Sequence, residues 1–388
     1  MSPVNFLHSA DWQIGKPFAG IDDPQKNSVV RQERILAIDR LGAAARNVEA
    51  EFVVVAGDLF DSTTPEKSTV SATCAAIGRI GLPVFAIPGN HDHAGPGSIW
   101  EQEFFRKEHA ALAPNLSILL SPDPVELEHA VLLPCPLMRR QDAGDPTAWL
   151  RGFNLSAFGN KPRIVLAHGS TQQFVALDPA DEDGPEGGAN QIALERLPGA
   201  DLDYVALGDW HGMKEVGAKA WYSGTPEFDR FAKGSDHSPG YVLAVTVRRG
   251  KAPAVNPIRT SRLGWHAVEH CFTDDTDLAV LETEMEGLLA ARVDQDLVRM
   301  DLTGSLGIAG FSRLDGLIET WRARLLRLKL SNQVRIAPSA EEMKAMTSRA
   351  ADPLISRVAV RLIEQMTAGG EAGEVARVAL RELHARIS

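Results

Sequence analysis

Three consecutive residues, Asn90, His91 and Asp92, carry side chains suited to acid–base chemistry beside a metal ion. They follow the apolar run 84–87, which predicts a short strand buried on both faces. An asparagine carbonyl can bind a metal, a histidine can move a proton near neutral pH, and an aspartate can hold an imidazole in one orientation. The tripeptide favours such chemistry only if other parts of the chain supply further ligands. A polar turn with a capping asparagine is the plainer interpretation.

Four other clusters repeat this pattern, in which acidic, amide or imidazole side chains follow an apolar run. Open α/β sheets bind ligands at the carboxyl ends of their strands, so these turns are expected to meet at one edge. Five occurrences in order make the pattern specific, whereas one alone would be weak. The runs and their clusters are 4–7 with Asp11 and Gln13, 52–56 with Asp58 and Asp61, 163–167 with His168, and 204–207 with Asp209 and His211.

The stretches between the first three runs have the spacing of crossover helices. Apolar residues recur at helical spacing over 29–46 and 69–80. Alternating strands and helices predict a parallel sheet with right-handed crossovers and helices over its faces. We therefore expect an α/β fold with two sheets packed between helices. Further predicted elements are strands at 116–120, 130–133, 240–248 and 254–258, and a short helix at 191–197.

A second alternation of strands and helices begins after residue 260, and none of its turns has metal-ligand spacing. Two amphipathic helices follow, at 353–366 and 373–387, separated by two glycines. The sequence thus predicts three domains. The first, 1–260, contains the clusters, the second, 261–345, is a small α/β domain, and the third, 346–388, is a pair of helices.

The chain of 388 residues has a formal net charge of −11 and a hydrophobic fraction of 44%. This fraction is sufficient for a sizeable core, and the negative charge counts against a simple nucleic-acid-binding surface. No apolar run of about 20 residues is present, so we expect no membrane span. The amino end lacks the pattern of a secretory leader, and Cys74, Cys135 and Cys271 lie far apart. These features predict a cytoplasmic protein whose cysteines are small core residues.

The series of clusters resembles the calcineurin-like metallophosphoesterase superfamily, whose blocks run D-x-H, GDxxD, GNHD, a lone H and GHxH. A closer resemblance is to SbcD-type DNA repair exonucleases, through LHSADWQIG near the amino end, GDLFD at 57–61 and WYSGTPE at 221–227. The resemblance is good over the larger, amino-terminal part of the chain and holds only in outline beyond it. It implies a two-sheet sandwich flanked by helices, a small α/β capping domain and carboxyl-terminal helices.

The resemblance also implies a centre with two divalent ions. Ions about 3.5–4 Å apart support phosphoester cleavage, and a hydroxide held by both would attack phosphorus. His91, aided by Asp92, would stabilise the developing charge or protonate the leaving group, and Asp61 would fix a ligand or the turn. Carried over position by position, the ligands are Asp11, Gln13, Asp58 and His211 for the first ion and Asp58, Asn90, His168 and Asp209 for the second, with Asp58 bridging both.

Two positions depart from the family pattern. Gln13 stands where D-x-H has histidine, and Asp209 stands where GHxH has its first histidine. An amide oxygen is a weaker, neutral ligand, whereas a carboxylate holds a cation well. Because only His168 and His211 are imidazoles, the oxygen-rich set suits manganese, or else magnesium, better than zinc. We favour an active, manganese-dependent enzyme over a site that has lost its metal.

These features favour a divalent-metal-dependent phosphodiesterase that acts on DNA as an exonuclease in DNA repair. A phosphodiesterase for a small nucleotide or another phosphoester is the alternative among enzymes, because the metal blocks do not choose a substrate. A non-catalytic subunit that binds DNA ends or an ATPase is the alternative from another class. The resemblance implies DNA, an SbcC-like coiled-coil ATPase and a second copy of this chain as partners.

The ATPase is expected to dock on the last two helices, which carry apolar stripes that must be buried somewhere. Either the two helices pack on each other or back on the body of the protein, or they bind a groove of another chain. The stripes are Ile355, Val358, Leu362 and Met366 on the first helix, and Ala376, Leu380, Leu383 and Ile387 on the second.

Three residues beside the clusters have plainer interpretations. His8 lies at the edge of a predicted strand and is expected to be structural. Trp12 and Trp210 adjoin predicted ligands. They would either stack on a base or pack in the core or the wall of a cleft.

Overall fold

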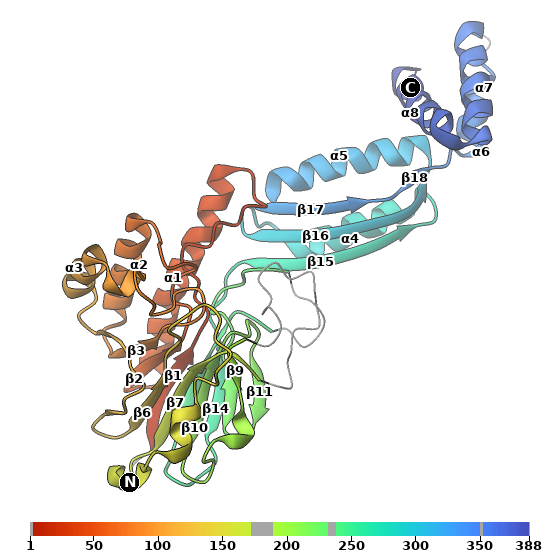
Figure 1. Cartoon of the computed structure of the whole chain (residues 1–388). Helices are drawn as coiled ribbons and strands as arrows, with labels where there is room; N and C mark the ends of the chain where they lie inside the picture. Colours follow the sequence, from red (N-terminus) through yellow and green to blue (C-terminus); the bar gives the residue numbers. More distant parts are fainter. Residues whose placement is uncertain (1–2, 172–188, 232–237, 350–351, 388) are drawn as a thin grey trace. The chain divides into compact units, whose positions relative to one another are not determined.

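The computed structural model describes residues 3–171, 189–231, 238–349 and 352–387 (Figure 1). The chain divides into two compact units, Met1–Leu263 and Gly264–Ser388, and each is described by itself below. The three-part division at residues 260 and 345 stays a prediction. No helix among the described residues is long and apolar enough to cross a membrane.

The first unit contains two six-stranded sheets. In the first sheet the order is β14-β13-β1-β2-β3-β4, with β1 to β4 parallel and β13 antiparallel to both of its neighbours. The order in the second sheet is β11-β12-β10-β7-β6-β5, and its central strands β12, β10, β7 and β6 are parallel. The strands of the first sheet are β1 (Val4–Ser9), β2 (Phe52–Ala56), β3 (Val84–Ile87), β4 (Leu116–Ile118), β13 (Tyr241–Val247) and β14 (Ala254–Arg259). Those of the second are β5 (Val125–Glu126), β6 (Val131–Cys135), β7 (Arg163–His168), β10 (Tyr204–Gly208), β11 (Lys214–Gly217) and β12 (Ala220–Tyr222).

Alternation along β2 explains how the first sheet is buried on both faces. Val53 and Val55 pack among side chains of the helices α1 (Pro24–Asn47), α2 (Lys67–Ile80) and α3 (Glu103–Leu112). Phe52 and Val54 point the other way and pack between the two sheets, against residues such as Leu166. The two sheets flanked by helices confirm the predicted α/β fold class (Figure 1).

In the part of the chain that the structure describes, short 3₁₀ helices rather than long crossover helices cover the outer face of the second sheet. Leu150 and Leu155, from the turns Ala148–Gly152 and Leu155–Phe158, pack on Val165 and Leu207 of the sheet. The predicted helix at 191–197 is wrong, because Gln191–Ile192 forms β9, which pairs with β8 (Ser170–Thr171), and only Leu194–Arg196 turns as a 3₁₀ helix. The helix α3 was not predicted from the sequence.

The second unit is built on parallel strands, β15 (Gly264–Phe272), β16 (Asp296–Leu306), β17 (Arg327–Asn332) and β18 (Arg335–Ile336). The helices α4 (Asp277–Leu289) and α5 (Ile308–Arg324) cover one face, where Val298 and Met300 pack against Leu281 and Leu314. Cys271 lies on β15 and is exposed, so the prediction of a core position is wrong for this cysteine, whereas Cys74 and Cys135 are buried.

Three helices end this unit, α6 (Ala340–Thr347), α7 (Pro353–Ala368) and α8 (Gly370–Ile387). They pack together around a small core in which Ala359 and Leu380 contact Ile308, and Leu362 and Met366 pack against it. The predicted apolar stripes are therefore largely used inside the unit. Val358 of the predicted stripe is nevertheless exposed, and so are apolar side chains outside the stripes, namely Leu354, Val360, Val375 and Val378.

Candidate metal centre

Four of the predicted ligand positions have backbone angles that side-chain-bearing residues rarely adopt. The φ angles are 54° at Asp11, 40° at Gln13, 55° at Asp58 and 106° at Asp209. Each lies on the turn that follows a strand, where the chain leaves the sheet. Left-handed backbone at residues other than glycine costs about 1–3 kcal/mol, and such strain is found mainly at functional sites. The strain directs these side chains to one edge of the two sheets.

Glycines let the turns approach each other closely. A Cβ atom at Gly57 would lie 2.1 Å from His168 Nδ1, and one at Gly89 would lie 2.1 Å from Asp58 Oδ1. Any larger residue at these two positions would push His168 and Asp58 out of place. The glycines in front of Asp58 and Asn90 are therefore part of the site.

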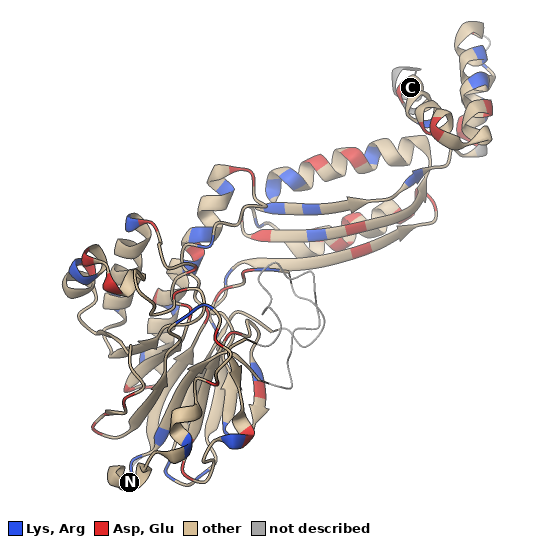
Figure 2. Cartoon of the chain, in the orientation of Figure 1, with Lys and Arg blue, Asp and Glu red and all other residues tan. Residues whose placement is uncertain are grey.

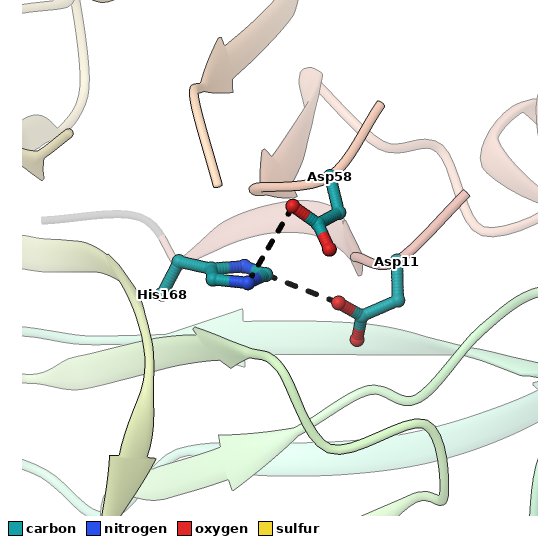
Figure 3. Close-up of side chains that lie close together, drawn as sticks. All are labelled: Asp11, Asp58 and His168. Carbon is teal, nitrogen blue, oxygen red and sulfur yellow. Dashed lines mark ion pairs between the residues drawn. The ribbon is translucent and has the colours of Figure 1, made fainter. Parts of the chain in front are cut away.

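His168 lies at the centre of the cluster (Figure 3). Its Nδ1–H donates to the carbonyl of Ala56 at 2.9 Å, so Nε2 is the ring nitrogen that is left to bind a cation. Nε2 lies 2.9 Å from Asn90 Oδ1, 3.6 Å from Asp58 Oδ1 and 3.8 Å from Asp209 Oδ1. Three oxygens thus surround this imidazole nitrogen, and such a set of atoms suits a divalent cation.

Asp11 gives a second sign that a cation fits here. Its Oδ1 accepts the N–H of Asp209 at 2.9 Å, whereas its buried Oδ2 has no hydrogen-bond partner among the described residues. A buried carboxylate oxygen without a partner is costly unless a cation binds it. Ligand atoms of Asp11, Asp58 and His168 all lie within 4.8 Å of one another. The residues present therefore fit a divalent ion at this end of the centre.

The electrostatic potential around His168 is strongly negative. Burial alone would lower the pKa of His168, but the carboxylates of Asp58, Asp11 and Asp209 raise it to about 9. Burial, together with the charge of Asp58, raises the pKa of Asp11 well above its ordinary value. Burial also raises the pKa of Asp209. For Asp58, burial is outweighed by the nearby imidazoles, chiefly His168, and its pKa is lowered. A divalent cation would relieve the repulsion among these carboxylates.

His211 and Gln13 lie on the other side of Asp58. His211 donates through Nδ1 to Asp229 Oδ2 at 2.8 Å, so its Nε2 carries the lone pair and faces Gln13 Nε2 at 3.3 Å. Gln13 Nε2 also lies 3.5 Å from Asp58 Oδ2. The structure therefore brings all seven predicted ligand positions to one place, but the amide nitrogen of Gln13, not its oxygen, faces the centre.

Asp92 does not hold His91, which differs from the prediction. Its two oxygens accept the backbone N–H groups of Gly89 at 2.7 Å and Phe60 at 3.0 Å. Asp92 therefore fixes the turn that carries Asn90. Burial raises the pKa of Asp92 to about 7.

The group that orients the imidazole of His91 is the carbonyl of Asp61, which accepts from Nδ1 at 3.0 Å. The other ring nitrogen, Nε2, lies 4.0 Å from Asp58 Oδ2, on the side of the centre. His91 also donates its backbone N–H to Asp58 Oδ1 at 3.0 Å.

The segment WYSGTPE supports the centre from behind. Tyr222 donates its hydroxyl to the carbonyl of Gly169 at 2.7 Å, next to His168. Arg34 is buried and donates to the carbonyls of Asp11 and Trp12 and to the hydroxyl of Thr225. Asp229, two residues after this segment, positions His211. The ammonium of Lys16 lies 3.4 Å from Asp229 Oδ2 and 3.2 Å from Gln13 Oε1. Sequence reasoning missed Asp229 and Lys16, since neither belongs to a predicted cluster.

The three neighbouring aromatic residues are packed. His8 accepts the hydroxyl of Tyr204 at Nδ1 and bonds the Leu207 carbonyl at Nε2, so it joins the two sheets and is structural, as expected. Trp12 is fully buried and donates to Ser9, so of its two predicted roles it packs in the core and does not stack on a base. Trp210 is half-buried and packs at the rim of the second sheet's outer core.

The profile of the calcineurin-like phosphoesterase family matches residues 4–238. Since this match spans more than half of the chain, the protein belongs to the calcineurin-like phosphoesterase family, whose members are divalent-metal-dependent phosphoester hydrolases. A crystal structure of TT1561 of Thermus thermophilus is 14% identical, with a TM-score of 0.39 over 67% of this chain and 100% of that one. A further crystal structure is 11% identical, with a TM-score of 0.40 and the same coverage. Likeness at this level supports no statement about function.

Proposed function

We propose that this protein is a metal-dependent phosphodiesterase that cleaves DNA, acting as an exonuclease in DNA repair. The observation that carries the hydrolytic part is the buried cluster of Asp11, Asp58 and His168, with His91 beside it. Belonging to the calcineurin-like phosphoesterase family supports metal-dependent phosphoester hydrolysis. DNA as the substrate is the finer part of the proposal, and it draws on the SbcD-type segments of the sequence.

The residues of the centre divide the work of hydrolysis. Asp58, Asn90, His168 and Asp209 would hold a divalent ion, which when bound supplies Lewis-acid activation of water and of the phosphoryl oxygens. His91 carries its proton on Nδ1 toward the Asp61 carbonyl and directs Nε2 to the centre. From this position a protonated His91 donates to the charge that develops on the phosphoryl oxygens or on the leaving group. The Asp61 carbonyl keeps the ring in that orientation.

One face of the sheet in the second unit carries cations that suit a phosphate backbone, beside the acidic residues Glu269 and Asp301. Arg299 on β16 pairs in register with Lys329 on β17, and Arg327 lies two residues before Lys329 on the same face. The helices α4 and α5 cover the opposite face, so these cations are on the open side of the sheet. Figure 2 shows cationic positions along β16 and β17, with acidic positions on β16 as well. Local cations of this kind allow phosphate contacts in a chain whose net charge is −11.

A comparison of three substrates tests this function. The purified chain is incubated with Mn²⁺ and linear duplex DNA, closed circular DNA, or bis-p-nitrophenyl phosphate. An exonuclease releases nucleotides from linear but not from circular DNA. Cleavage of the small diester alone supports the phosphodiesterase alternative and refutes the nuclease. Binding of metal and DNA without cleavage of any substrate supports the non-catalytic subunit. The same assays with His91→Ala show whether any cleavage comes from this site.

We also propose that a coiled-coil ATPase of the SbcC type docks on α7 and α8. The exposed apolar side chains Leu354, Val358, Val375 and Val378 support this, because they remain in water after the helices have packed on Ile308. Leu354→Asp and Val375→Asp change only exposed positions, so they are expected to fold and to lose co-purification with the ATPase. The matched control is Val280→Asp, because the side chain of Val280 on α4 is 59% exposed. Unchanged co-purification in both helix variants would refute this docking face.

A further inference from the structure

Lys16 decides which way the side-chain amide of Gln13 points. Its ammonium group lies 3.2 Å from Gln13 Oε1. An ammonium can only donate, so the oxygen of the amide must be the atom on that side. The amide nitrogen is then turned toward the centre, where it lies 3.3 Å from His211 Nε2 and 3.5 Å from Asp58 Oδ2.

In this orientation an amide N–H of Gln13 donates to the lone pair on His211 that a cation would need. His211 is held by Asp229 through Nδ1, so its Nε2 lone pair is the one free to bind, and an N–H of Gln13 occupies it. The second N–H of the amide points to Asp58 Oδ2. Turning the amide over would offer its oxygen to a cation, but it would also place the NH₂ group against the ammonium of Lys16.

The surrounding charge opposes a cation at the same place. Lys16 and Arg230 lie 3.4 Å and 3.1 Å from Asp229 Oδ2, directly behind His211. Both cations are largely shielded from water, with side-chain exposures of 13% and 22%. Around His168 Nε2 the neighbouring atoms are instead oxygens, from Asn90, Asp58 and Asp209. The two ends of the centre therefore differ in their surroundings: two cations and one carboxylate stand behind His211, whereas only oxygens surround His168 Nε2.

We propose that this centre binds one divalent ion tightly, at Asp58, Asn90, His168 and Asp209 with a carboxylate oxygen of Asp11 close beside them, and that the Gln13–Lys16 pair takes the place of a second ion. The ammonium of Lys16 and the amide N–H groups of Gln13 supply the positive charge and the hydrogen-bond donors on that side. This inference rests on the metal-dependent part of the proposed function and does not depend on DNA being the substrate. It replaces the expectation of two bound ions, the first of them held more loosely because Gln13 is a weak ligand.

Metal stoichiometry tests the inference without any measurement of activity. Mn²⁺ is titrated into the metal-free full chain and followed by calorimetry, with elemental analysis after dialysis. The wild type is expected to retain one ion per chain, and any second ion is expected to bind at least about tenfold more weakly. The double variant Gln13→His with Lys16→Met restores an imidazole and removes the ammonium, so it should retain two ions. Gln13→His combined with Lys107→Met, an exposed lysine on α3, is the matched control and should retain one.

Electron paramagnetic resonance adds a signature that depends on the distance between ions. A spin-coupled manganese pair is expected in the double variant and not in the wild type. Two equally tight ions or a coupled pair in the wild type would overturn this inference alone, and the metal-dependent function would stand. No bound ion in the wild type would overturn both. A folded double variant that still holds one ion would show that the Gln13–Lys16 pair does not replace the second one.

Discussion

The backbone N–H of Asp209 donates to Asp11 Oδ1 at 2.9 Å, and this bond joins turns that lie 198 residues apart in the chain. Asp11 follows β1 of the first sheet, and Asp209 follows β10 of the second. The bond fixes one oxygen of Asp11 and leaves the other, Oδ2, buried without a partner in the part of the chain that the structure describes. The relative position of the two sheets therefore sets the geometry of the metal centre.

Asp58→Asn is expected to remove bound metal, because the carboxylate of Asp58 lies between His168 and Gln13 in the centre. Its oxygens lie 3.6 Å from His168 Nε2 and 3.5 Å from Gln13 Nε2. We expect manganese affinity to fall by about 10²-fold or more, as measured by calorimetry. Asp39→Asn, at a partly exposed aspartate that pairs with Arg79, is the control and should bind normally. Normal metal content in folded Asp58→Asn would show that Asp58 is not a ligand.

His91→Ala is expected to lower turnover by about 10²-fold or more while metal content stays intact, as for the loss of a general acid. The imidazole is held by the Asp61 carbonyl and directs Nε2 toward Asp58, but it is not among the four ligands near His168. Turnover under saturating substrate and metal content by elemental analysis are measured on the same preparation. A metal-loaded variant with full turnover would remove His91 from the mechanism.

Manganese is expected to bind and to sustain activity better than zinc or magnesium. The ligands around His168 Nε2 are three oxygens and one imidazole, a set that suits manganese better than zinc, and the imidazole favours manganese over magnesium. Competition titrations on the metal-free chain, together with activity in each metal, measure the order. An activity that is highest with zinc would contradict this prediction.

His8 is expected to make stability depend on pH. Burial lowers its pKa to about 3, against an ordinary value of about 6.5, so the folded state binds fewer protons than the unfolded state between these values. The contribution of His8 to the free energy of unfolding is therefore fully present above pH 6.5. It falls as the pH drops toward 3, by up to about 1.4 kcal/mol per pH unit. Urea unfolding from about pH 7 to about pH 4.5 should show a steeper loss in the wild type than in His8→Gln. Equal slopes would show that His8 is not buried in its neutral form.

The strands and the turns that carry chemistry could be predicted from the sequence alone. The bounds 52–56 and 84–87 agree with β2 and β3, because an unbroken apolar run followed by glycine and polar residues is a local signal. The meeting of Asp58, Asn90, His168 and Asp209 was also expected, since parallel strands end at a common edge. Short segments with weaker patterns were not predictable in this way. Gln191–Ile192 forms a strand because it finds Ser170–Thr171 as a partner.

The tertiary structure alone decided the direction and the partner of individual side chains. Sequence patterns do not show that Asp92 bonds the backbone of Phe60, or that Asp229 holds His211. They show Gln13 as a changed residue, but only the ammonium of Lys16 determines which atom of its amide faces the centre. The reason is physical. A strand or turn is set by neighbours along the chain, whereas a hydrogen bond is set by which groups from distant segments fold to within about 3 Å of each other.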